Sequence, residues 1–348
     1  MSVPCIDPLD VAGDEAMPTL ALALDPDLVG ARFAGLPRLT GPRGRVRVLA
    51  AGVLRYKPGR RCVIEYRAEV QRSDGSREAV RLIGKIRRRR SGVSAFKLQA
   101  SLWASGFSDD SADGISVPEP LGVLPEVGMW LQRAAPGRAA TELLAARGGP
   151  ELAGRIAEAA HKLHRAGVRP LRRHSMADEV RILRERLAAV TAIAPRWAGR
   201  IARVLCWCER LAASVPEPVA RGIHRDYYAD QVLVHGAHLY LTDFDCYCQG
   251  DPALDIGNFT GHVREHALRA LGDPEALAPV ERALEDRFAE LAGEAVRPAV
   301  RAYATLTLAR HIHLSTVLAD RTHLTGQLLE LCEEALGSAT RARSRCSG

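Results

Sequence analysis

Acidic side chains gather in one stretch of the chain, residues 223–259, which holds six aspartates and one arginine in a protein whose formal net charge is +7. A negatively charged stretch within a positively charged protein indicates a bound cation. Three residues carry the most information, because the stretch begins HRDxxxxQ at Asp226 and Gln231 and continues to TDFD at Asp243. Amide and carboxylate oxygens are hard ligands of the kind magnesium takes. A further carboxylate at the tip of a loop can accept a proton from a hydroxyl group.

The spacing of these residues reproduces the layout of a protein-kinase catalytic loop and its metal-binding partner. Phosphoryl transfer requires a positioned acceptor hydroxyl and neutralised phosphate charge, usually through magnesium. In this layout Asp226 is the base, while Gln231 and Asp243 bind magnesium. Apolar runs at 232–234 and 239–241 predict two short strands and a turn, which bring both metal ligands to one end.

The segment resembles the phosphotransferase family that includes aminoglycoside and choline kinases, in which the motifs commonly read HGDxxxxN and IDFxxxxxGDPxxDLA. The matching residues are His224, Asp226, Gln231, Asp243, Phe244, Gly250, Asp251, Pro252 and Asp255. In two departures, Arg225 replaces the usual glycine, as in protein kinases, and Gln231 replaces asparagine. Glutamine is one methylene longer but offers the same carbonyl oxygen. The resemblance implies that Asp255 is structural and braces the catalytic loop through backbone hydrogen bonds.

The resemblance also implies a two-lobed α+β fold like that of protein kinases, with a small β-rich N-lobe and a larger, mainly helical C-lobe. We expect a helical N-terminal extension at 1–40, the N-lobe at 41–135 and the C-lobe at 136–348. Branched and aromatic residues predict strands at 46–56, 62–70, 79–87 and 127–132. Apolar residues at three- and four-residue spacing predict helices at 94–105, 139–146 and 151–166, and within 176–213 and 263–341.

On the third strand, Lys85 matches the lysine that holds the nucleotide phosphates in kinases, and a lysine at an exposed strand end is the alternative. Kinases pair this lysine with a glutamate on the next helix, but residues 94–105 contain no acid. Gln99 is the nearest polar substitute. The lysine is expected to pair instead with another carboxylate, such as Glu65 or Glu69 on the neighbouring strand. The alternative is that the protein binds nucleotide more weakly than usual.

Two further nucleotide contacts follow from the resemblance. The basic turn KPGRR at 57–61 occupies the place of the loop that covers the phosphates, so Arg60 and Arg61 are candidate phosphate contacts, and a solvated turn is the alternative. The adenine edge is expected to meet the backbone of a hinge. The hinge residues are Gln132, Arg133 and Ala134. ATP is the expected nucleotide and GTP the alternative, because main-chain recognition says little about the base.

The acceptor is the least specified part of the sequence. Residues 272–294 hold seven acids against two arginines, which would favour a cationic acceptor such as an aminoglycoside if they faced its cleft. The alternative is the wet side of an amphipathic helix with Val280, Leu284, Phe288 and Leu291 as its buried stripe. His161 and His164 are expected to pack or cap rather than bind metal. The function implied is transfer of the ATP γ-phosphate to a small-molecule hydroxyl; a nucleotide-binding regulator without turnover is the alternative.

Composition is ordinary for a globular protein, with 47% apolar and 26% charged residues. Residues 41–100 hold seventeen Lys and Arg against four acids, including the arginine run 87–90. Nucleic acid is disfavoured as a partner because no aromatic residues interleave this run, and a basic lobe also suits a polyphosphate ligand. No stretch is long and apolar enough for a membrane span, and no signal-peptide pattern opens the chain, so a cytoplasmic location is expected. The eight scattered cysteines are expected to be reduced thiols, and the oligomeric state stays open.

Overall fold

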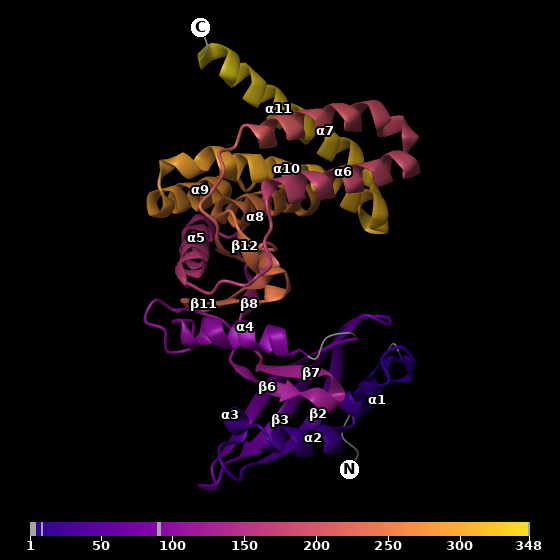
Figure 1. The fold of residues 1–348 in the computed structure, drawn as a ribbon, viewed down its shortest axis with the longest axis vertical. Helices are drawn as coiled ribbons and strands as arrows, with labels where there is room; N and C mark the ends of the chain where they lie inside the picture. Colours follow the sequence, from indigo (N-terminus) through magenta and orange to yellow (C-terminus); the bar gives the residue numbers. More distant parts are fainter. Residues whose placement is uncertain (1–4, 8–9, 89–91, 347–348) are drawn as a thin grey trace. The chain divides into compact units, whose positions relative to one another are not determined.

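The chain forms two compact units in its computed structural model, which describes residues 5–7, 10–88 and 92–346. Unit 1 comprises residues 1–137 with 235–242, and unit 2 comprises 138–234 with 243–348. Unit 1 is rich in strands and unit 2 is mainly helical (Figure 1), which confirms the predicted α+β class. Arg89 and Arg90 of the predicted basic run lie outside the described residues.

Unit 1 is built on a six-stranded sheet with the order β1-β2-β3-β4-β7-β6. Its strands are β1 (Cys5–Ile6), β2 (Arg45–Lys57), β3 (Arg61–Gln71), β4 (Arg77–Arg87), β6 (Pro120–Leu124) and β7 (Met129–Arg133). Neighbouring strands are antiparallel except β1, which is parallel to β2. The predicted strands are confirmed, although β7 begins two residues late because residues from Pro125 to Val127 form a single helical turn.

The N-terminal helices of unit 1 share the core of this sheet. They are α1 (Thr19–Leu24), α2 (Pro26–Ala34) and α3 (Pro37–Thr40), while α4 (Val93–Ala104) contacts strands β6 and β7. Unit 1 also contains a short parallel pair of strands, β5 (Ile115–Ser116) and β11 (His238–Leu241). Every second side chain of β3 is buried, as expected for a strand with one face on a core. Among these, the Tyr66 ring meets Phe33 of α2 edge to face, with 5.1 Å between centroids. Its hydroxyl donates to the Ala23 carbonyl oxygen at 2.8 Å, so the N-terminal helices and the sheet form one core.

Unit 2 is a helical assembly with α10 in contact with α6, α8 and α11. Its helices are α5 (Gly149–Arg165), α6 (Met176–Ile193), α7 (Ala198–Ala213), α8 (Pro252–His266), α9 (Ala278–Ala292), α10 (Arg297–Val317) and α11 (Thr325–Cys346). Its strands are β8 (Arg138–Ala139), β9 (Arg221–Ile223), β10 (Val232–His235) and β12 (Cys248–Gly250). β8 pairs with β10 and β9 with β12, both antiparallel. The predicted strands around the turn at Gly236 are therefore present as β10 and β11.

The helix predicted at 139–146 is wrong. This segment contains the end of β8, a single helical turn at Ala140–Glu142 and further turns before α5. Its apolar pattern covers only eight residues and runs into Gly148-Gly149-Pro150, and a helix this short is marginal by itself. Leu144 is buried without a helix. Gly149 packs so tightly on it that a Cβ there would lie 2.0 Å from the Leu144 carbonyl oxygen.

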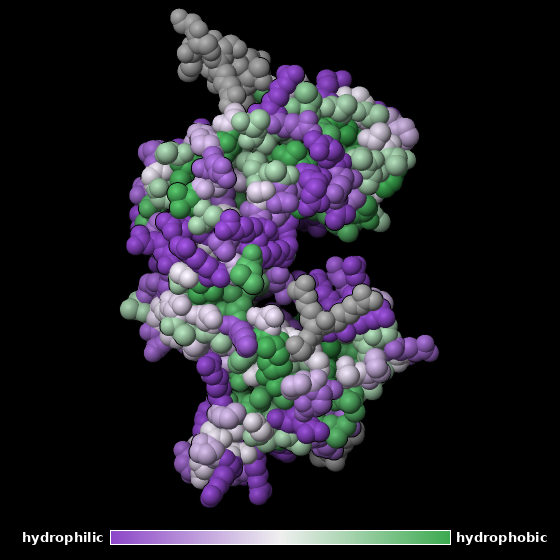
Figure 2. Space-filling view, viewed as in Figure 1, coloured by the Kyte–Doolittle hydropathy of each residue, from purple (hydrophilic) through white to green (hydrophobic). Residues whose placement is uncertain are grey.

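The cysteines and the exposed apolar side chains are distributed over both units. All six cysteines with described side chains are free thiols, with Cys206 exposed and Cys208 buried on α7. Large exposed apolar side chains are scattered rather than clustered, for example Leu54 and Leu171, and Figure 2 shows polar and apolar residues intermixed on each unit. No helix in the described part of the chain combines the length and apolar character needed to cross a membrane.

Candidate active site

The catalytic loop of unit 2 leaves β9 through a close contact that only glycine allows. Ile223 of β9 pairs with Cys248 of β12, and Gly222 precedes it. A Cβ at Gly222 would lie 2.1 Å from the Tyr247 hydroxyl oxygen. That hydroxyl donates to the Val168 carbonyl oxygen at 2.9 Å, so the start of the loop is fixed against β12 and the segment after α5.

Asp255 on α8 braces this loop, as the resemblance implied. Its side chain is fully buried, and its two oxygens accept hydrogen bonds from the backbone N–H groups of His224 at 2.8 Å and Arg225 at 2.7 Å. His164 of α5 lies 2.8 Å from the same carboxylate through Nε2. The predicted structural role of Asp255 is confirmed. His164, expected to pack or cap, is a third member of this brace.

We expect Asp255→Asn to destabilise unit 2 by about 1–3 kcal/mol, because its amide N–H₂ would face a buried N–H donor that then lacks an acceptor. Urea unfolding followed by circular dichroism measures the change. Asp286→Asn, an exposed carboxylate on α9, is the matched control. An unfolding midpoint equal to that of the wild type would contradict the brace.

The other side of the loop is held by Tyr227 and Asn258. The Tyr227 hydroxyl donates to the Ile156 carbonyl oxygen at 2.9 Å, and Asn258 Nδ2 donates to the Tyr227 carbonyl oxygen at 2.9 Å. Asp226 therefore lies between two backbone groups that are each tied to a helix. Its own side chain is partly exposed, and within the described part of the chain its carboxylate accepts no hydrogen bond.

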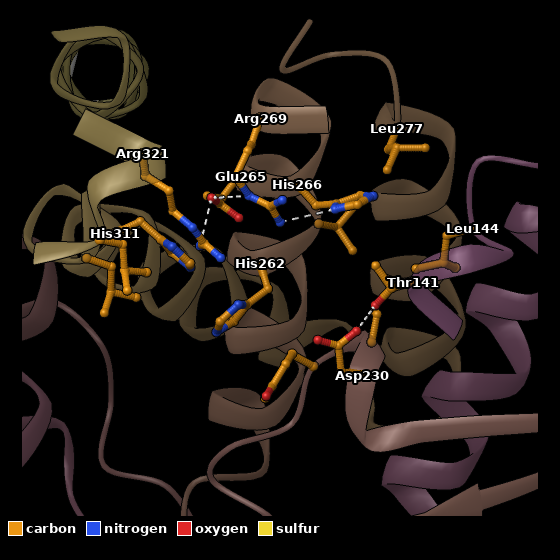
Figure 3. A pocket seen from close by; sticks show the side chains of 15 residues that line it. Thr141, Leu144, Asp230, His262, Glu265, His266, Arg269, Leu277, His311 and Arg321 are labelled. Atoms are coloured by element: carbon orange, nitrogen blue, oxygen red, sulfur yellow. Dashed lines mark hydrogen bonds and ion pairs between the residues drawn. The ribbon is translucent and has the colours of Figure 1, made fainter. Parts of the chain in front are cut away.

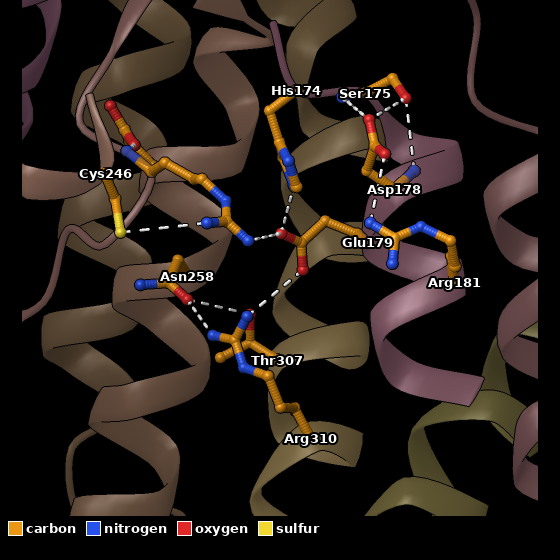
Figure 4. Close-up of polar contacts among 11 residues, drawn as sticks. His174, Ser175, Asp178, Glu179, Arg181, Cys246, Asn258, Thr307 and Arg310 are labelled. Atoms are coloured by element: carbon orange, nitrogen blue, oxygen red, sulfur yellow. Dashed lines mark hydrogen bonds and ion pairs between the residues drawn. The ribbon is translucent and has the colours of Figure 1, made fainter. Parts of the chain in front are cut away.

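A buried cluster of charges links the loop to the helices around it (Figure 4). Its centre is Glu179 of α6, which is 5% exposed. His174 Nε2 lies 2.6 Å from one carboxylate oxygen, Arg310 of α10 donates to the other at 3.2 Å, and Arg225 reaches the first at 3.6 Å. Although burial disfavours the charge of Glu179, the hydrogen bond from His174 and the two arginines hold its pKa below the ordinary value.

Arg310 extends this cluster back to the loop. Its Nη2 donates to Asn258 Oδ1 at 2.6 Å, and Asn258 in turn binds the Tyr227 carbonyl oxygen. Arg225 has a positive φ of 68°. Glycine adopts this conformation without cost. In this chain an arginine holds it, and its guanidinium lies 3.6 Å from the Glu179 carboxylate.

The predicted metal ligands lie on the two segments that flank β10 and β11. Gln231 is buried, and its Nε2 donates to the Tyr228 hydroxyl at 3.0 Å, which orients the amide. Asp243 has left-handed φ and ψ of 59° and 62° at the start of a helical turn. The next residue, Phe244, packs on the ring of His224 with 5.0 Å between centroids, which ties this turn to the catalytic loop.

The donor set fits magnesium in a nucleotide site. Within the described ranges there is no group of three or more His, Cys, Asp and Glu side chains that could hold a metal alone. Magnesium commonly binds one or two carboxylates and completes its shell with phosphates and water, so Asp243 and the Gln231 amide oxygen suffice. Burial raises the pKa of the Cys246 thiol, and the charge of Asp226 raises it further, while the charges of Arg225 and Arg172 lower it.

The predicted nucleotide-side residues lie in unit 1. Lys85 on β4 places Nζ 5.0 Å from the centre of the Trp130 ring on β7, a cation–π contact. The acids expected to pair with it are engaged elsewhere. Glu65 binds Arg81 through a short ion pair. Glu69 lies 3.7 Å from Arg47 and 3.6 Å from Arg77.

Gln99 does not replace the missing helix glutamate as suggested. It is buried on α4, and its Nε2 donates to the Pro118 carbonyl oxygen at 2.6 Å and to Gln132 Oε1 at 3.1 Å. In the hinge, the Arg133 N–H donates to the carbonyl oxygen of Glu119, just before β6, and the Ala134 N–H to that of Arg81 on β4, each at 2.9 Å. The base of a nucleotide would therefore have to form hydrogen bonds with other backbone groups of this segment.

The basic turn between β2 and β3 is fixed by an acid that the sequence analysis missed. Asp14 accepts hydrogen bonds from the Gly59 N–H and from the Tyr56 hydroxyl, both at 2.8 Å. These bonds, the Gly59 one first, lower the pKa of Asp14. Arg60 is exposed at the turn and Arg61 is partly buried at the start of β3. No sequence signal near the turn points to Asp14.

A pocket of about 260 Å³ in unit 2 begins two residues beyond Asp226. The loop from Tyr228 to Asp230, α8 and α10 line it, together with a short π-helix (Ala267–Leu271) that continues α8. π-helical turns are frequent at functional sites. Tyr228 stacks on His262, with 4.7 Å between ring centroids, and His311 meets His262 edge to face at 4.6 Å. This aromatic row forms one wall of the pocket.

The buried histidine of this wall predicts acid sensitivity. Burial first, and then the charges of Arg310, Arg321 and Arg269, together lower the pKa of His311 to about 3. The folded protein keeps this ring neutral, whereas the unfolded chain takes up a proton below about pH 6.5, so stability falls as the pH drops. We expect the change from pH 7 to pH 5 to cost about 2 kcal/mol through His311.

Urea unfolding of the wild type and of His311→Gln at both pH values measures this component. The variant should lose less stability on acidification than the wild type does. His323→Gln, at an exposed histidine outside the pocket, should behave like the wild type. Equal losses in the wild type and in His311→Gln would show that this ring is protonated in the folded protein.

The acidic segment at 272–294 does not face the pocket. Of its residues, only Leu277 lines it among the described residues. The acids pair with arginines instead. Glu281 binds Arg264 of α8, while Glu285 lies 3.4 Å from Arg297 and 2.8 Å from Arg301. The amphipathic interpretation is confirmed, since the stripe is buried at Val280, Leu284 and Phe288 and partly buried at Leu291.

Comparisons with known proteins identify the family and the fold of the chain. Residues 71–303 match the phosphotransferase enzyme family. A choline/ethanolamine kinase family protein from Mesorhizobium loti superposes with a TM-score of 0.57 at 19% identity, covering 89% of this chain and 94% of that one. An aminoglycoside phosphotransferase, APH(4)-Ia, in complex with AMP-PNP and hygromycin B gives 0.55 at 16% identity, covering 84% and 94%. Amicoumacin kinase hAmiN in complex with AMP-PNP, Ca²⁺ and Ami gives 0.56 at 16%, covering 81% and 88%.

At these identities the structural likeness shows the fold, and the predicted kinase-like α+β architecture is confirmed. No curated protein matches the chain.

Proposed function

The chain belongs to the phosphotransferase enzyme family, a family of small-molecule kinases, and we propose that it transfers the γ-phosphate of ATP to a hydroxyl group of a small acceptor. The observation that carries the proposal is the braced loop around Asp226, with both of its backbone neighbours hydrogen-bonded to helices. A carboxylate held this rigidly and left without an internal partner is suited to accept a proton.

In the proposed reaction, Asp226 orients the acceptor hydroxyl and takes its proton as the new phosphorus–oxygen bond forms. Gln231 and Asp243 would hold magnesium, which would supply positive charge to neutralise the phosphates. Lys85 contacts the nucleotide phosphates, and Arg60 and Arg61 are further phosphate contacts. The backbone at Gln132, Arg133 and Ala134 lies along the base. Two of the similar structures hold AMP-PNP, which supports an adenine nucleotide.

The pocket beside Asp230 is the proposed acceptor site. It is lined by the catalytic loop immediately after Asp226 and Tyr227, so an acceptor held there lies next to the base. Similar structures are named for choline or ethanolamine and for amicoumacin, and one holds hygromycin B. We infer a small hydroxylated molecule of comparable or smaller size.

A nucleotide-binding regulator without turnover is the second candidate. The absence of an acid from α4 and the engagement of Gln99, Glu65 and Glu69 with other partners favour it. Such a protein would bind Mg-ATP and leave the γ-phosphate in place.

The deciding experiment follows the labelled γ-phosphate of ATP, and in parallel of GTP, in the presence of magnesium and sets of choline-like amines, amino sugars, sugars, sugar acids and aminoglycosides. The kinase proposal predicts a labelled, acceptor-dependent product that requires magnesium. Calorimetry measures Mg-ATP binding in the same preparation. Tight binding of Mg-ATP with no labelled product from any acceptor class would favour the regulator.

A further inference from the structure

The wall of the pocket opposite Asp230 carries an excess of positive charge. Glu265 is buried, and its Oε1 accepts hydrogen bonds from Arg269 Nε at 2.9 Å and from Arg321 Nη1 at 3.3 Å. Two guanidinium groups therefore share the one buried carboxylate of this wall, Glu265. A second acid, Asp320, lies 3.9 Å from Arg321 Nε, but its side chain is 76% exposed to solvent. Figure 3 shows both arginines converging on Glu265, with Asp230 and Thr141 at the other side of the pocket.

The two histidines at this wall add no charge near neutral pH. The pKa of His262 is lowered by burial first and then by His311 and nearby arginines, as that of His311 is. Both rings are thus neutral near pH 7, in a positive potential created by Arg310, Arg321 and Arg269.

His311 adds an unused polar atom. Its side chain is 2% exposed, it lines the pocket, and its Nε2 has no hydrogen-bond partner among the described residues. Arg321 Nε likewise has no hydrogen bond there. Buried polar atoms nearly always have a partner, so these two atoms indicate a ligand group that accepts hydrogen bonds. With its proton on Nε2, His311 would be a third donor beside two guanidinium groups.

We propose that the pocket binds an acceptor carrying an oxyanion, a carboxylate or a phosphate, whose charge is held by Arg269, Arg321 and His311. This inference rests on the proposed kinase function and narrows its acceptor to hydroxylated acids. Guanidinium groups recognise both oxyanions through charge-assisted hydrogen bonds. A polycationic acceptor fits poorly, because the acids among the described lining residues are Asp230 and Glu265, and Glu265 is already shared by two arginines.

Acceptors with one carbon skeleton and different charges test the proposal. The set is glycerol, glycerate, glycerol phosphate and aminopropanediol, with glucose, gluconate, glucose phosphate and glucosamine as a second set. Calorimetry without nucleotide gives the affinity, and transfer of labelled phosphate gives turnover. We expect an acid of one set to bind at least about tenfold more tightly than its neutral and amine counterparts. The carboxylate and phosphate members distinguish the two oxyanions.

Variants at the wall tie the binding to this pocket. Arg321→Gln should lower the affinity for the preferred acid at least about tenfold. Arg321→Lys, which keeps the charge, should lower that affinity less. Arg301→Gln is the matched control, because Arg301 pairs with Glu285 on the surface and does not line the pocket. Circular dichroism confirms folding of each variant.

The outcomes separate this inference from the kinase proposal. Preferred binding or turnover of an amine or neutral acceptor would overturn the oxyanion assignment and leave the kinase function standing. No binding of any acid at millimolar concentration would also overturn it. Binding of an acid that depends on Arg321, with no phosphate transfer to any acceptor, would support the site and overturn the kinase function.

Discussion

Replacement of Asp226 by asparagine should lower phosphate transfer by about two to four orders of magnitude, because a positioned base contributes a factor of this size. The amide keeps the shape of the side chain but does not take up the proton. Stability should change by less than about 0.5 kcal/mol, since the carboxylate is partly exposed and makes no hydrogen bond within the described residues. Turnover is measured with the acceptor found in the labelling experiment, or as slow ATP hydrolysis with water as acceptor.

A control variant at another exposed carboxylate shows whether the effect comes from the loss of the base or from the loss of one negative charge. Asp286→Asn on α9 removes one negative charge from an ion pair with Arg297, and its turnover should equal that of the wild type. Affinity for Mg-ATP should be similar in all three proteins, because Asp226 is proposed to act on the acceptor. Turnover of Asp226→Asn within tenfold of the wild type would mean that another group takes the proton.

Local patterns in the sequence predicted the parts of the fold that depend on neighbouring residues. The runs of branched and aromatic residues at 46–56 and 62–70 became β2 and β3, and every second side chain of β3 lies on the core. The candidate site was also readable, since the loop around Asp226 and the turn at Asp243 lie within one short stretch. Proton transfer and metal binding restrict which residue types can stand at these positions. The two strands and the turn between them, β10 and β11 with Gly236, set the distance between them along the chain.

Contacts between distant segments could not be predicted. Asp14 holds the turn at Gly59 from 45 residues away, and nothing in its own neighbourhood distinguishes it from other turn aspartates. The charge cluster around Glu179 joins α6, α10 and the catalytic loop, so it exists only once these elements have packed. The prediction of a helix at 139–146 was wrong for a related reason. Leu144 is buried by contacts with distant residues, and such burial does not require the residues around it to form a helix.

Replacement of Glu179 by alanine should destabilise unit 2 by about 3–5 kcal/mol, because it leaves Arg225 and Arg310 buried without their shared counter-charge. These side chains are 16% and 21% exposed, so water compensates them poorly. Arg310 keeps its bond to Asn258, whereas Arg225 loses its carboxylate partner. Urea unfolding measures the stability. Because Arg225 adjoins Asp226, kcat should fall more than the KM for ATP rises, which a purely structural effect would not produce.

A double-mutant cycle isolates the pair of Glu179 and Arg225. Arg225→Gly removes the guanidinium and relieves a positive φ that costs an L-residue about 1–2 kcal/mol. In the Glu179→Ala background, Arg225→Gly removes a charge that has lost its partner and should restore part of the stability. The double variant should therefore lose at least about 1 kcal/mol less stability than the sum of the two single variants. Additivity within about 0.5 kcal/mol would mean that the two side chains are energetically independent. Glu179 would then stabilise unit 2 through His174 and Arg310 alone, and the arginine of the catalytic loop would need another reason to hold the conformation of a glycine.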